Sequence, residues 1–392
     1  MPNDVSAVLP KILARGLMTL RHRVMMPRLV NADYSRLAAQ KGSVIDVPVP
    51  AAKTATAVTP GATPPTPSNT TPTRIQVPLD QWYHSDCQLS DNDLAQIDKD
   101  QSFLPMEVQE CFKALANNVN QYLWGLYKGV YGIVGTAGTT PFASDASAAT
   151  NARKTLNKQL CPLDLRSAVL DYDAEANALA LAPFRDASQS ADNAVVSEGQ
   201  IGRKYGMQWF GDDHVPTHTS TVLTAGAATV NGVNAAGAGS TDNLRTGTIS
   251  IAKATNSAPL VAGDIIEFTV GTAVQQHVVV TGVTLAVGNT TVTIAPALRV
   301  ATAGGEAVTL RTTHVVNMAF RYDAFAFATR SLIEPSLDVG APGYKMETMT
   351  DPVSRLTVRV EVMRQYKQWC WDFDILYGGL LVQPANAVRI AG

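Results

Sequence analysis

Two segments in the C-terminal part of the chain alternate hydrophobic and polar residues, as a strand does when one of its faces is buried. The alternating hydrophobic positions are Leu356, Val358, Val360 and Val362 in the first segment, and Trp369, Trp371, Phe373 and Ile375 in the second. Both segments are therefore expected to be strands with one face in a hydrophobic core.

The strongest helical pattern lies over residues 103–131, where apolar residues recur every three or four positions. This stripe consists of Leu104, Val108, Cys111, Phe112, Leu115, Val119, Leu123, Leu126 and Val130. Pro105 suits a first helical turn, and a series of glycines from Gly129 onward ends the pattern. At a rise of about 1.5 Å per residue, the helix would be roughly 40 Å long, which indicates a structural spine.

Residues 5–26 repeat the helical spacing, and their basic residues fall mostly outside the apolar stripe. Those basic residues are Lys11, Arg15, Arg21 and Arg23. A basic amphipathic helix can lie on a membrane or on an acidic surface. Docking on a neighbouring domain or subunit is the more common arrangement, and we expect it here.

Residues 42–92 combine two strand-like runs, VIDVPVP and RIQVPLDQWY, with an uncharged connection between them. The connection, Thr54–Thr73, contains eight threonines and five prolines in 20 residues. A hairpin turn usually needs only about two to five residues. The pattern therefore predicts a two-stranded ribbon that holds out a long, proline-stiffened extension.

The middle of the chain predicts a mixed α/β region interrupted by an all-β insertion. A helix is expected over NARKTLNKQLCP and a strand over RSAVLDYD. We also expect a short helix followed by a strand over 197–216. Over 314–332 we expect the reverse order, a strand followed by a short helix. Residues 220–313 differ sharply, with short β-runs between Gly and Asn turns and only eight charged residues in 94. The expected fold class is α+β with an inserted small barrel or sandwich.

Composition and charge narrow the function classes. The 392 residues are 46% hydrophobic and only 16% charged, which suits a large core or a surface covered by partners. The net charge of −2 gives no overall signature of nucleic-acid binding, although residues 1–41 carry seven Lys or Arg against two Asp. The four cysteines lie far apart and are expected to be free, buried thiols in a reducing compartment. The chain shows neither a long apolar run nor a signal-peptide pattern.

No pattern in the sequence predicts an active site. His214 and His218 are four positions apart, but a proline lies between them and no HExxH motif is present. The GDD at 211–213 is better explained by a turn after a strand, and Asp372 and Asp374 by surface charge on an alternating strand. We therefore expect no enzyme, no metal site and no cofactor.

The order of these parts resembles that of the tailed-bacteriophage major capsid (coat) proteins, most closely the short-tailed phage coat proteins with a telokin-like inserted domain. The local sequences that carry the resemblance are SEGQIGRKYGMQWF before the insertion, HVVNMAFRYDAFAFATRSLIEP after it, and LVAGDIIEFTV within it. The resemblance covers essentially the whole chain.

The resemblance implies a tailed-phage major-capsid fold and a division of the chain into named parts. These are an N-terminal arm (1–41), an E-loop reaching over the neighbouring subunit (42–92), a spine helix of the peripheral domain (93–132), a first part of the peripheral and axial domains (133–219), an inserted β-barrel domain (220–313) and a second part of those domains (314–392). The strands at 166–171 and 355–362 would belong to the peripheral domain.

The function implied is that of a major capsid protein, which assembles as pentamers and hexamers into an icosahedral shell around double-stranded DNA. Implied partners are further copies of the chain, scaffolding and portal proteins, and packaged DNA contacted non-specifically, with no membrane. The protein would assemble in the bacterial cytoplasm and reside in the virion.

The resemblance also assigns site residues. Contacts between subunits would come from the E-loop residues Lys53, Val58, Arg74, Asp80 and Trp82, and the inner surface would carry the basic residues Lys11, Arg15, Arg21 and Arg23. Some relatives join their subunits by a lysine–asparagine isopeptide bond. Because Lys53 lies at the base of the loop and the tip has no lysine, we expect no such cross-link here.

Two other functions compete with this interpretation. A secreted carbohydrate-binding or adhesive protein could use the Thr/Pro run as a stalk and the β-rich insertion as a lectin-like module. The absence of a signal-peptide pattern and the long helix argue against it. A metal-dependent enzyme using His214 and His218 is the weakest of the three.

Overall fold

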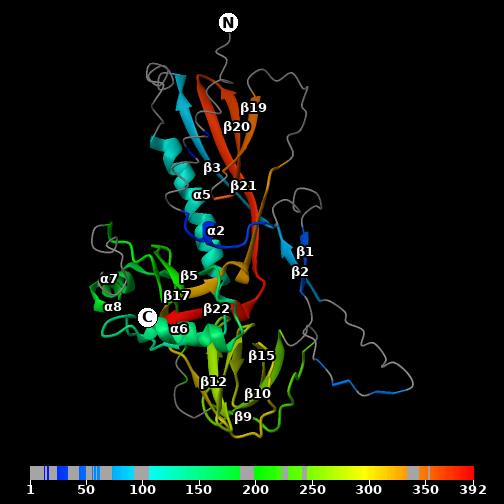
Figure 1. The fold of residues 1–392 in the computed structure, drawn as a ribbon. Helices are drawn as coiled ribbons and strands as arrows, with labels where there is room; N and C mark the ends of the chain where they lie inside the picture. Colours follow the sequence, from blue (N-terminus) through cyan, green and yellow to red (C-terminus); the bar gives the residue numbers. More distant parts are fainter. Residues whose placement is uncertain are drawn as a thin grey trace.

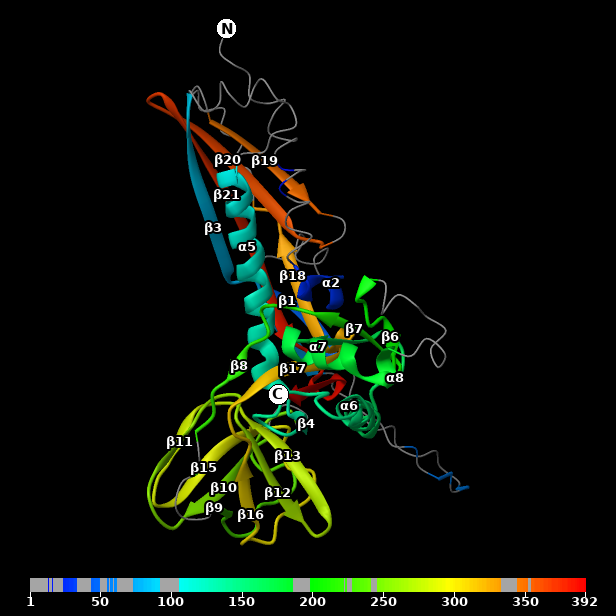
Figure 2. The same ribbon diagram turned by 90° about the vertical axis from the view of Figure 1, so that its left-hand side faces the viewer.

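The long helix and the alternating strands of the sequence pack together along the length of an elongated molecule (Figure 1). The computed structural model describes residues 13, 16, 24–33, 44–49, 55, 57–58, 60–61, 73–91, 106–185, 198–221, 223, 228–240, 245–332, 344–351 and 354–392. Within these residues, a five-stranded sheet, a seven-stranded sheet and a closed barrel follow one another from one end to the other (Figure 2).

The five-stranded sheet is entirely antiparallel and is built around its longest strand, β21. Its strands are β3 (Gln81–Ser90), β18 (Phe325–Arg330), β19 (Tyr344–Thr350), β20 (Thr357–Gln365) and β21 (Gln368–Leu381). The alternating residues Val358, Val360 and Val362 are buried on one face, as are Trp371, Phe373 and Ile375. The two strands predicted from alternation are therefore confirmed.

Helix α5 (Met106–Gly125) lies along this sheet and continues into the 3-10 helix η2 (Leu126–Gly129). Its apolar stripe, including Leu115 and Val119, is buried in the main core, where the ring of Phe112 lies 4.6 Å from that of Phe373. The described α-helix has 20 residues and is roughly 30 Å long, shorter than the 40 Å expected. Its continuation to Gly129 is a tighter 3-10 turn.

The seven-stranded sheet is mixed, because β22 pairs with β4 and β5 with β7 in parallel. Its strands are β4 (Gly132–Gly135), β5 (Arg166–Leu170), β6 (Arg203–Lys204), β7 (Met207–Gly211), β8 (Thr217–His218), β17 (His314–Arg321) and β22 (Ala387–Ala391). One face packs against the helices α6 (Ser147–Lys158), α7 (Tyr172–Ala180) and α8 (Ala182–Arg185). The helix and strand predicted over this region, α6 and β5, are confirmed.

An all-β barrel is inserted between β8 and β17, which confirms the expected insertion. Its six strands are β9 (Ala228–Val230), β10 (Gly247–Lys253), β12 (Ile265–Val270), β13 (Ala273–Val279), β15 (Gly288–Ala295) and β16 (Ala307–Leu310), with β11 (Ala258–Leu260) paired to β14 (Val283–Leu285) beside them. Every second residue of β10 is buried, so the barrel has its own hydrophobic core. Its relation to a telokin-like domain stays a prediction.

A buried polar cluster joins the barrel to the rest of the molecule. His218 on β8 contacts the Asp264 carboxylate through Nε2 at 2.9 Å and the Tyr127 hydroxyl through Nδ1 at 3.0 Å. Arg389 of β22 lies over the Tyr127 ring and donates to the Gly263 carbonyl at 2.8 Å. Burial lowers the pKa of Arg389 to about 9. These contacts fix the barrel to η2, which carries Tyr127, and to β22, which carries Arg389.

Two local predictions are wrong in part. The short helix expected before the strand in 197–216 does not extend past Glu198, the one described helical residue of that range. The β6–β7 hairpin follows instead, because positive φ at Tyr205 and Gly206 forms a two-residue turn. The short helix expected at the end of 314–332 is the strand β18, which follows the 3-10 turn η3 (Tyr322–Ala324).

The two strands expected in the peripheral domain lie in different sheets, and their assignment to that domain stays a prediction. β5 lies in the seven-stranded sheet and β20 in the five-stranded sheet, so the strands at 166–171 and 355–362 belong to different layers. The pairing partners of a strand are distant in sequence, and hydrophobic periodicity does not specify them.

Candidate functional site

A two-stranded ribbon projects from the side of the molecule where the five- and seven-stranded sheets meet (Figure 1). Strand β1 (Val44–Val49) pairs with β2 (Thr73–Pro78) in antiparallel register, from Val44 opposite Pro78 to Val49 opposite Thr73. The ribbon predicted from the two strand-like runs is confirmed. We call this pair of strands the arm.

The expected extent of the arm needs correction. Residues 81–90, placed in the same unit by the range 42–92, form β3 and pair with β21 inside the five-stranded sheet. The long connection is described only at residues 55, 57–58 and 60–61, where Val58 is 92% exposed. Lys53 and most of Thr54–Thr73 lie outside the described residues.

One face of the arm is held firmly by the body of the molecule. Ile45, Val47 and Val77 are buried and pack against Ala326 and Ala328 of β18. Because strand residues alternate between faces, the neighbouring positions are directed away from the body. The arm therefore has a fixed inner face and a free outer face.

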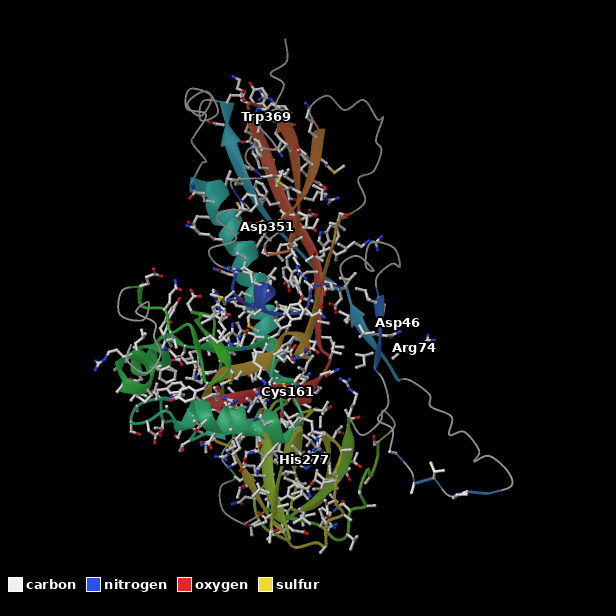
Figure 3. The ribbon with its side chains drawn as sticks, in the orientation of Figure 1. Asp46, Arg74, Cys161, His277, Asp351 and Trp369 are labelled. Carbon is white, nitrogen blue, oxygen red and sulfur yellow. The ribbon has the colours of Figure 1, made fainter. Side chains whose placement is uncertain are left out.

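The outer face carries charges that are weakly satisfied within the subunit. Arg74 and Asp46 lie side by side in Figure 3, with 3.9 Å between Nη1 and Oδ2 and with both side chains substantially exposed. The Gln76 side-chain amide donates to the other Asp46 oxygen at 3.2 Å. An exposed pair of this kind contributes about 0–1 kcal/mol to stability. Both charges therefore remain available to another surface at little cost.

Asp80 and Trp82 lie at the root of the arm, where the chain enters β3. Asp80 is exposed and accepts a bond from the Gln81 side chain at 2.9 Å. The Trp82 ring is 63% exposed, while its indole N–H donates to Asp374 at 3.0 Å. Asp374 in turn accepts two bonds from Arg359. The exposed ring is thus held in one orientation by a buried ion pair.

The same ion pair corrects the expectation for Asp372 and Asp374. Asp374 is only 5% exposed and is paired with Arg359, so it is not a surface charge. Asp372 is the more exposed of the two and lies 3.1 Å from His84 Nδ1 on β3. Both carboxylates therefore have partners on neighbouring strands.

A second exposed region lies at the far end of the five-stranded sheet, where Figure 3 labels Trp369. Arg364 lies over the Trp369 ring at 4.8 Å and binds both carboxylate oxygens of Asp91. This guanidinium lowers the pKa of the Asp91 carboxyl. In the turn beyond it, Tyr366 is 86% exposed. The turn therefore presents a large aromatic side chain to solvent.

The predicted basic arm cannot be placed. Lys11, Arg15, Arg21 and Arg23 all lie outside the described residues. Of residues 1–23, the structure describes only Leu13 and Gly16. The described chain resumes at Val24 and forms the short helix α2 (Met26–Leu29) against α5. The basic inner surface stays a prediction.

The two histidines considered as metal ligands lie in different surroundings. His218 belongs to the polar cluster at the barrel, whereas His214 lies 2.5 Å from Asp213 in the turn after β7. Among the described residues, Asp212, Asp213 and His214 are the one group with ligand atoms close enough for a metal ion. Asp212, however, is already saturated with hydrogen bonds.

The hydrogen bonds of Asp212 have a structural role. Its two oxygens accept from the Asn120 side-chain amide at 3.1 and 2.9 Å, and one also accepts from the Trp124 indole at 2.8 Å. The other accepts the backbone N–H of His214. Asn120 also accepts the backbone N–H of Met26 through its side-chain oxygen. The GDD turn thus ties β7, α5 and α2 together.

The cysteines and the helices were also compared with the expectations from the sequence. All four cysteines are buried and none forms a disulfide, as expected. Burial raises the pKa of the Cys161 thiol, which disfavours the reactive thiolate. No helix among the described residues is long and apolar enough to cross a membrane.

Comparisons with known proteins bear on the fold. No family model and no curated protein matches the sequence. A solved chain from Mycobacterium phage Che8 aligns with a TM-score of 0.51 and 14% identity, over 94% of this chain and 91% of that chain. The chain therefore shares the fold of this solved phage chain. At this identity the likeness concerns the fold alone.

Two further structures align at lower TM-scores. The capsid structure of Cyanophage P-SCSP1u gives 0.47 at 12% identity, over 93% of this chain and 86% of that one. A virus-like particle from Pyrococcus furiosus aligns with a TM-score of 0.45 and 6% identity, over 97% of this chain and 98% of that chain.

Within this fold, sequence reasoning missed the residue that lets the arm leave the sheet. Gly378 on β21 passes directly beneath the end of β2, and a Cβ atom there would lie 1.8 Å from the Pro78 carbonyl oxygen. The sequence contains a GG pair at this point, but alternation predicts only a strand through it. Tyr83, 44% exposed beside Trp82, was also missed.

Proposed function

We propose that the chain is a major capsid protein that assembles as pentamers and hexamers into an icosahedral shell around double-stranded DNA. The observation that carries the proposal is the fold that the chain shares, over nearly its whole length, with a solved chain of Mycobacterium phage Che8. The resemblance of the sequence to phage coat proteins supports it. The protein acts as a structural component of a phage virion rather than as an enzyme. Scaffolding and portal proteins would be its partners during assembly in the bacterial cytoplasm.

The arm is the part of the subunit that best fits an intersubunit contact. Its inner face is anchored by Ile45, Val47 and Val77, while Asp46 and Arg74 on the outer face form only a weak mutual pair. The connection beyond it is uncharged and rich in proline, so it loses little entropy and leaves few charges unpaired when it docks. We assign the arm and its connection, residues 44–78, as an E-loop.

The remaining parts map onto the capsid architecture as follows. The five-stranded sheet with α5 would be the peripheral domain, and the seven-stranded sheet with α6 and α7 the axial domain. The barrel within 220–313 would face outward, and the basic segment 1–41 would lie inside, near packaged DNA.

Replacement of the arm's connection tests this function. Thr54–Thr73 would be exchanged for a Gly-Ser segment of equal length, which keeps the connection but removes its prolines and side chains. We expect circular dichroism of the variant to match that of the unmodified subunit, because the segment has no pattern able to fill a core. Sedimentation velocity and negative-stain microscopy should then show subunits or small oligomers in place of shells.

Two outcomes would contradict the proposal. An unmodified protein that forms no shell, capsomer or sheet under any assembly condition would argue against a capsid function and for a secreted adhesive protein. Normal shells from the Gly-Ser variant would show that the connection makes no essential contact between subunits, even if the protein is a capsid subunit.

A further inference from the structure

A recess of about 240 Å³ lies between α2 and the edge of the seven-stranded sheet. Six polar residues line it: Arg28, Arg166, Ser167, Arg203, Gln208 and Tyr322. Three of these side chains are arginines, and none of the described lining residues is a carboxylate. This concentration of one charge sign is unexpected in a chain whose overall charge is −2.

The register of the sheet brings three of these residues into one row. Gln208 of β7 lies opposite Ser167 of β5 and opposite Arg203 of β6. Paired residues on adjacent strands point to the same face of a sheet. The opposite face carries the buried Met207 and Trp209, which pack against the helices. The row therefore presents two neutral polar side chains and one guanidinium on the side that α2 partly covers.

Arg166, which precedes Ser167 on β5, is a buried arginine that also lines the recess. It is only 4% exposed, and its guanidinium donates to the carbonyl oxygens of Pro162 at 2.8 Å and Cys161 at 2.6 Å. Neither acceptor carries a charge. The neighbouring carboxylates Asp164 and Asp323 both bind Arg321 instead. Among the described residues, Arg166 thus hydrogen-bonds only neutral carbonyl groups, and an anion in the recess would add a charged acceptor.

The other two arginines are exposed at the mouth of the recess. Arg28 lies in the last turn of α2, and its position is set by the burial of Met26 and Pro27. Arg203 lies at the β6 edge of the sheet. Within the part of the chain that the structure describes, neither guanidinium has an acceptor. Both are therefore free to bind a ligand.

Tyr322 adds a directed hydroxyl group. Its oxygen accepts a bond from Arg355 Nη1 at 3.0 Å, and Arg355 also binds Asp33. Because the phenol oxygen is occupied as an acceptor, its own O–H remains able to donate. The lining thus consists of three guanidinium groups and several neutral groups able to donate hydrogen bonds.

We propose that this recess binds a phosphate group. The two oxygens of a planar carboxylate are both occupied by a single bidentate guanidinium. A tetrahedral phosphate has more acceptor oxygens and a larger negative charge, so it can bind several guanidinium groups at once. The same chemistry could be presented by free inorganic phosphate or by a phosphodiester of nucleic acid. The inference stands on the geometry of the recess and does not depend on shell assembly.

Calorimetric titration of the purified full-length subunit tests the proposal. Inorganic phosphate and a short DNA duplex would be titrated separately into the wild type, Arg203→Gln, Arg28→Gln and the control Arg185→Gln. Arg185 is exposed at the end of α8 and does not line the recess, so its variant has the same change in net charge. This control corrects for the general loss of DNA affinity that accompanies removal of any positive charge.

We expect at least one of the two probes to bind, with an affinity about tenfold weaker in both recess variants and little changed in the control. Binding of phosphate with this pattern identifies the free ion as sufficient, and binding of the duplex alone identifies nucleic acid as the source. The proposal is wrong if neither probe binds, or if the recess variants behave like Arg185→Gln. Both variants change exposed side chains, so a folding defect is not expected to confuse the result.

Discussion

Replacing Asp212 by alanine should destabilise the subunit strongly, because this one carboxylate satisfies three donors, two on α5 and one in its own turn. Asp212 is 4% exposed. Its removal leaves the Asn120 side-chain amide, the Trp124 indole and the backbone N–H of His214 without their acceptor. The contacts at α5 are fully buried, so water cannot easily replace the carboxylate there.

The magnitude follows from the number of orphaned donors. Each buried donor left without an acceptor costs about 1–3 kcal/mol. The three costs overlap, since they share one cavity, and we expect a loss of roughly 3–5 kcal/mol in the free energy of unfolding. Asp212→Asn keeps the shape and one acceptor oxygen, so it should lose roughly half as much.

Urea unfolding of the unassembled subunit, followed by tryptophan fluorescence and circular dichroism, measures these losses. The matched control is Asp213→Ala, because the adjacent carboxylate is 43% exposed and contacts His214 at the surface. The control should lose less than about 1 kcal/mol. Equal losses for Asp212→Ala and Asp213→Ala would refute the conclusion that the buried network holds α5, β7 and α2 together.

Three further predictions test the core, the barrel and the arm. Leu115→Ala, in the buried stripe of α5, should lower the free energy of unfolding by roughly 2–5 kcal/mol, whereas Gln121→Ala at an exposed position should lower it little. Equal urea midpoints for the two variants would show that the assigned buried face of α5 is wrong. Burial lowers the pKa of His277 from 6.5 to about 4. Between these pH values the unfolded chain binds a proton that the folded barrel does not. The free energy of unfolding should therefore fall by up to roughly 3 kcal/mol as the pH drops from 6.5 towards 4. His277→Gln should reduce this pH dependence in urea midpoints, and an unchanged dependence would show that other groups cause it. Gly378→Ala places a Cβ against the carbonyl oxygen at the end of β2 and should lower the free energy of unfolding by roughly 3 kcal/mol or more. Gly125→Ala, with open space around it, should be tolerated. A lower melting temperature for Gly125→Ala than for Gly378→Ala would contradict the close contact between the arm and β21.

The sequence alone determined the local elements, because backbone periodicity is a local property. Alternation at Val358, Val360 and Val362 identified β20, and the three-to-four spacing around Leu115 identified α5. The low charge and the short β-runs of 220–313 predicted the barrel, and the flanking runs predicted the arm. Local turn chemistry was less reliable: Tyr205 and Gly206 form a hairpin turn that their sequence did not reveal, since a tyrosine rarely adopts positive φ.

Only the tertiary structure decided which strands are neighbours and which polar side chains meet. Strand β3 pairs with β21, nearly three hundred residues away, and this pairing limits the arm to residues 44–78. Asp212, which accepts from Asn120, is distant from it in sequence, and so are Arg28 and Arg166, which line the recess with Arg203. No spacing rule could therefore have identified the Asp212 network or the arginine-lined recess. Periodicity specifies which face of an element is buried, whereas the choice of partner depends on how several such faces pack in three dimensions.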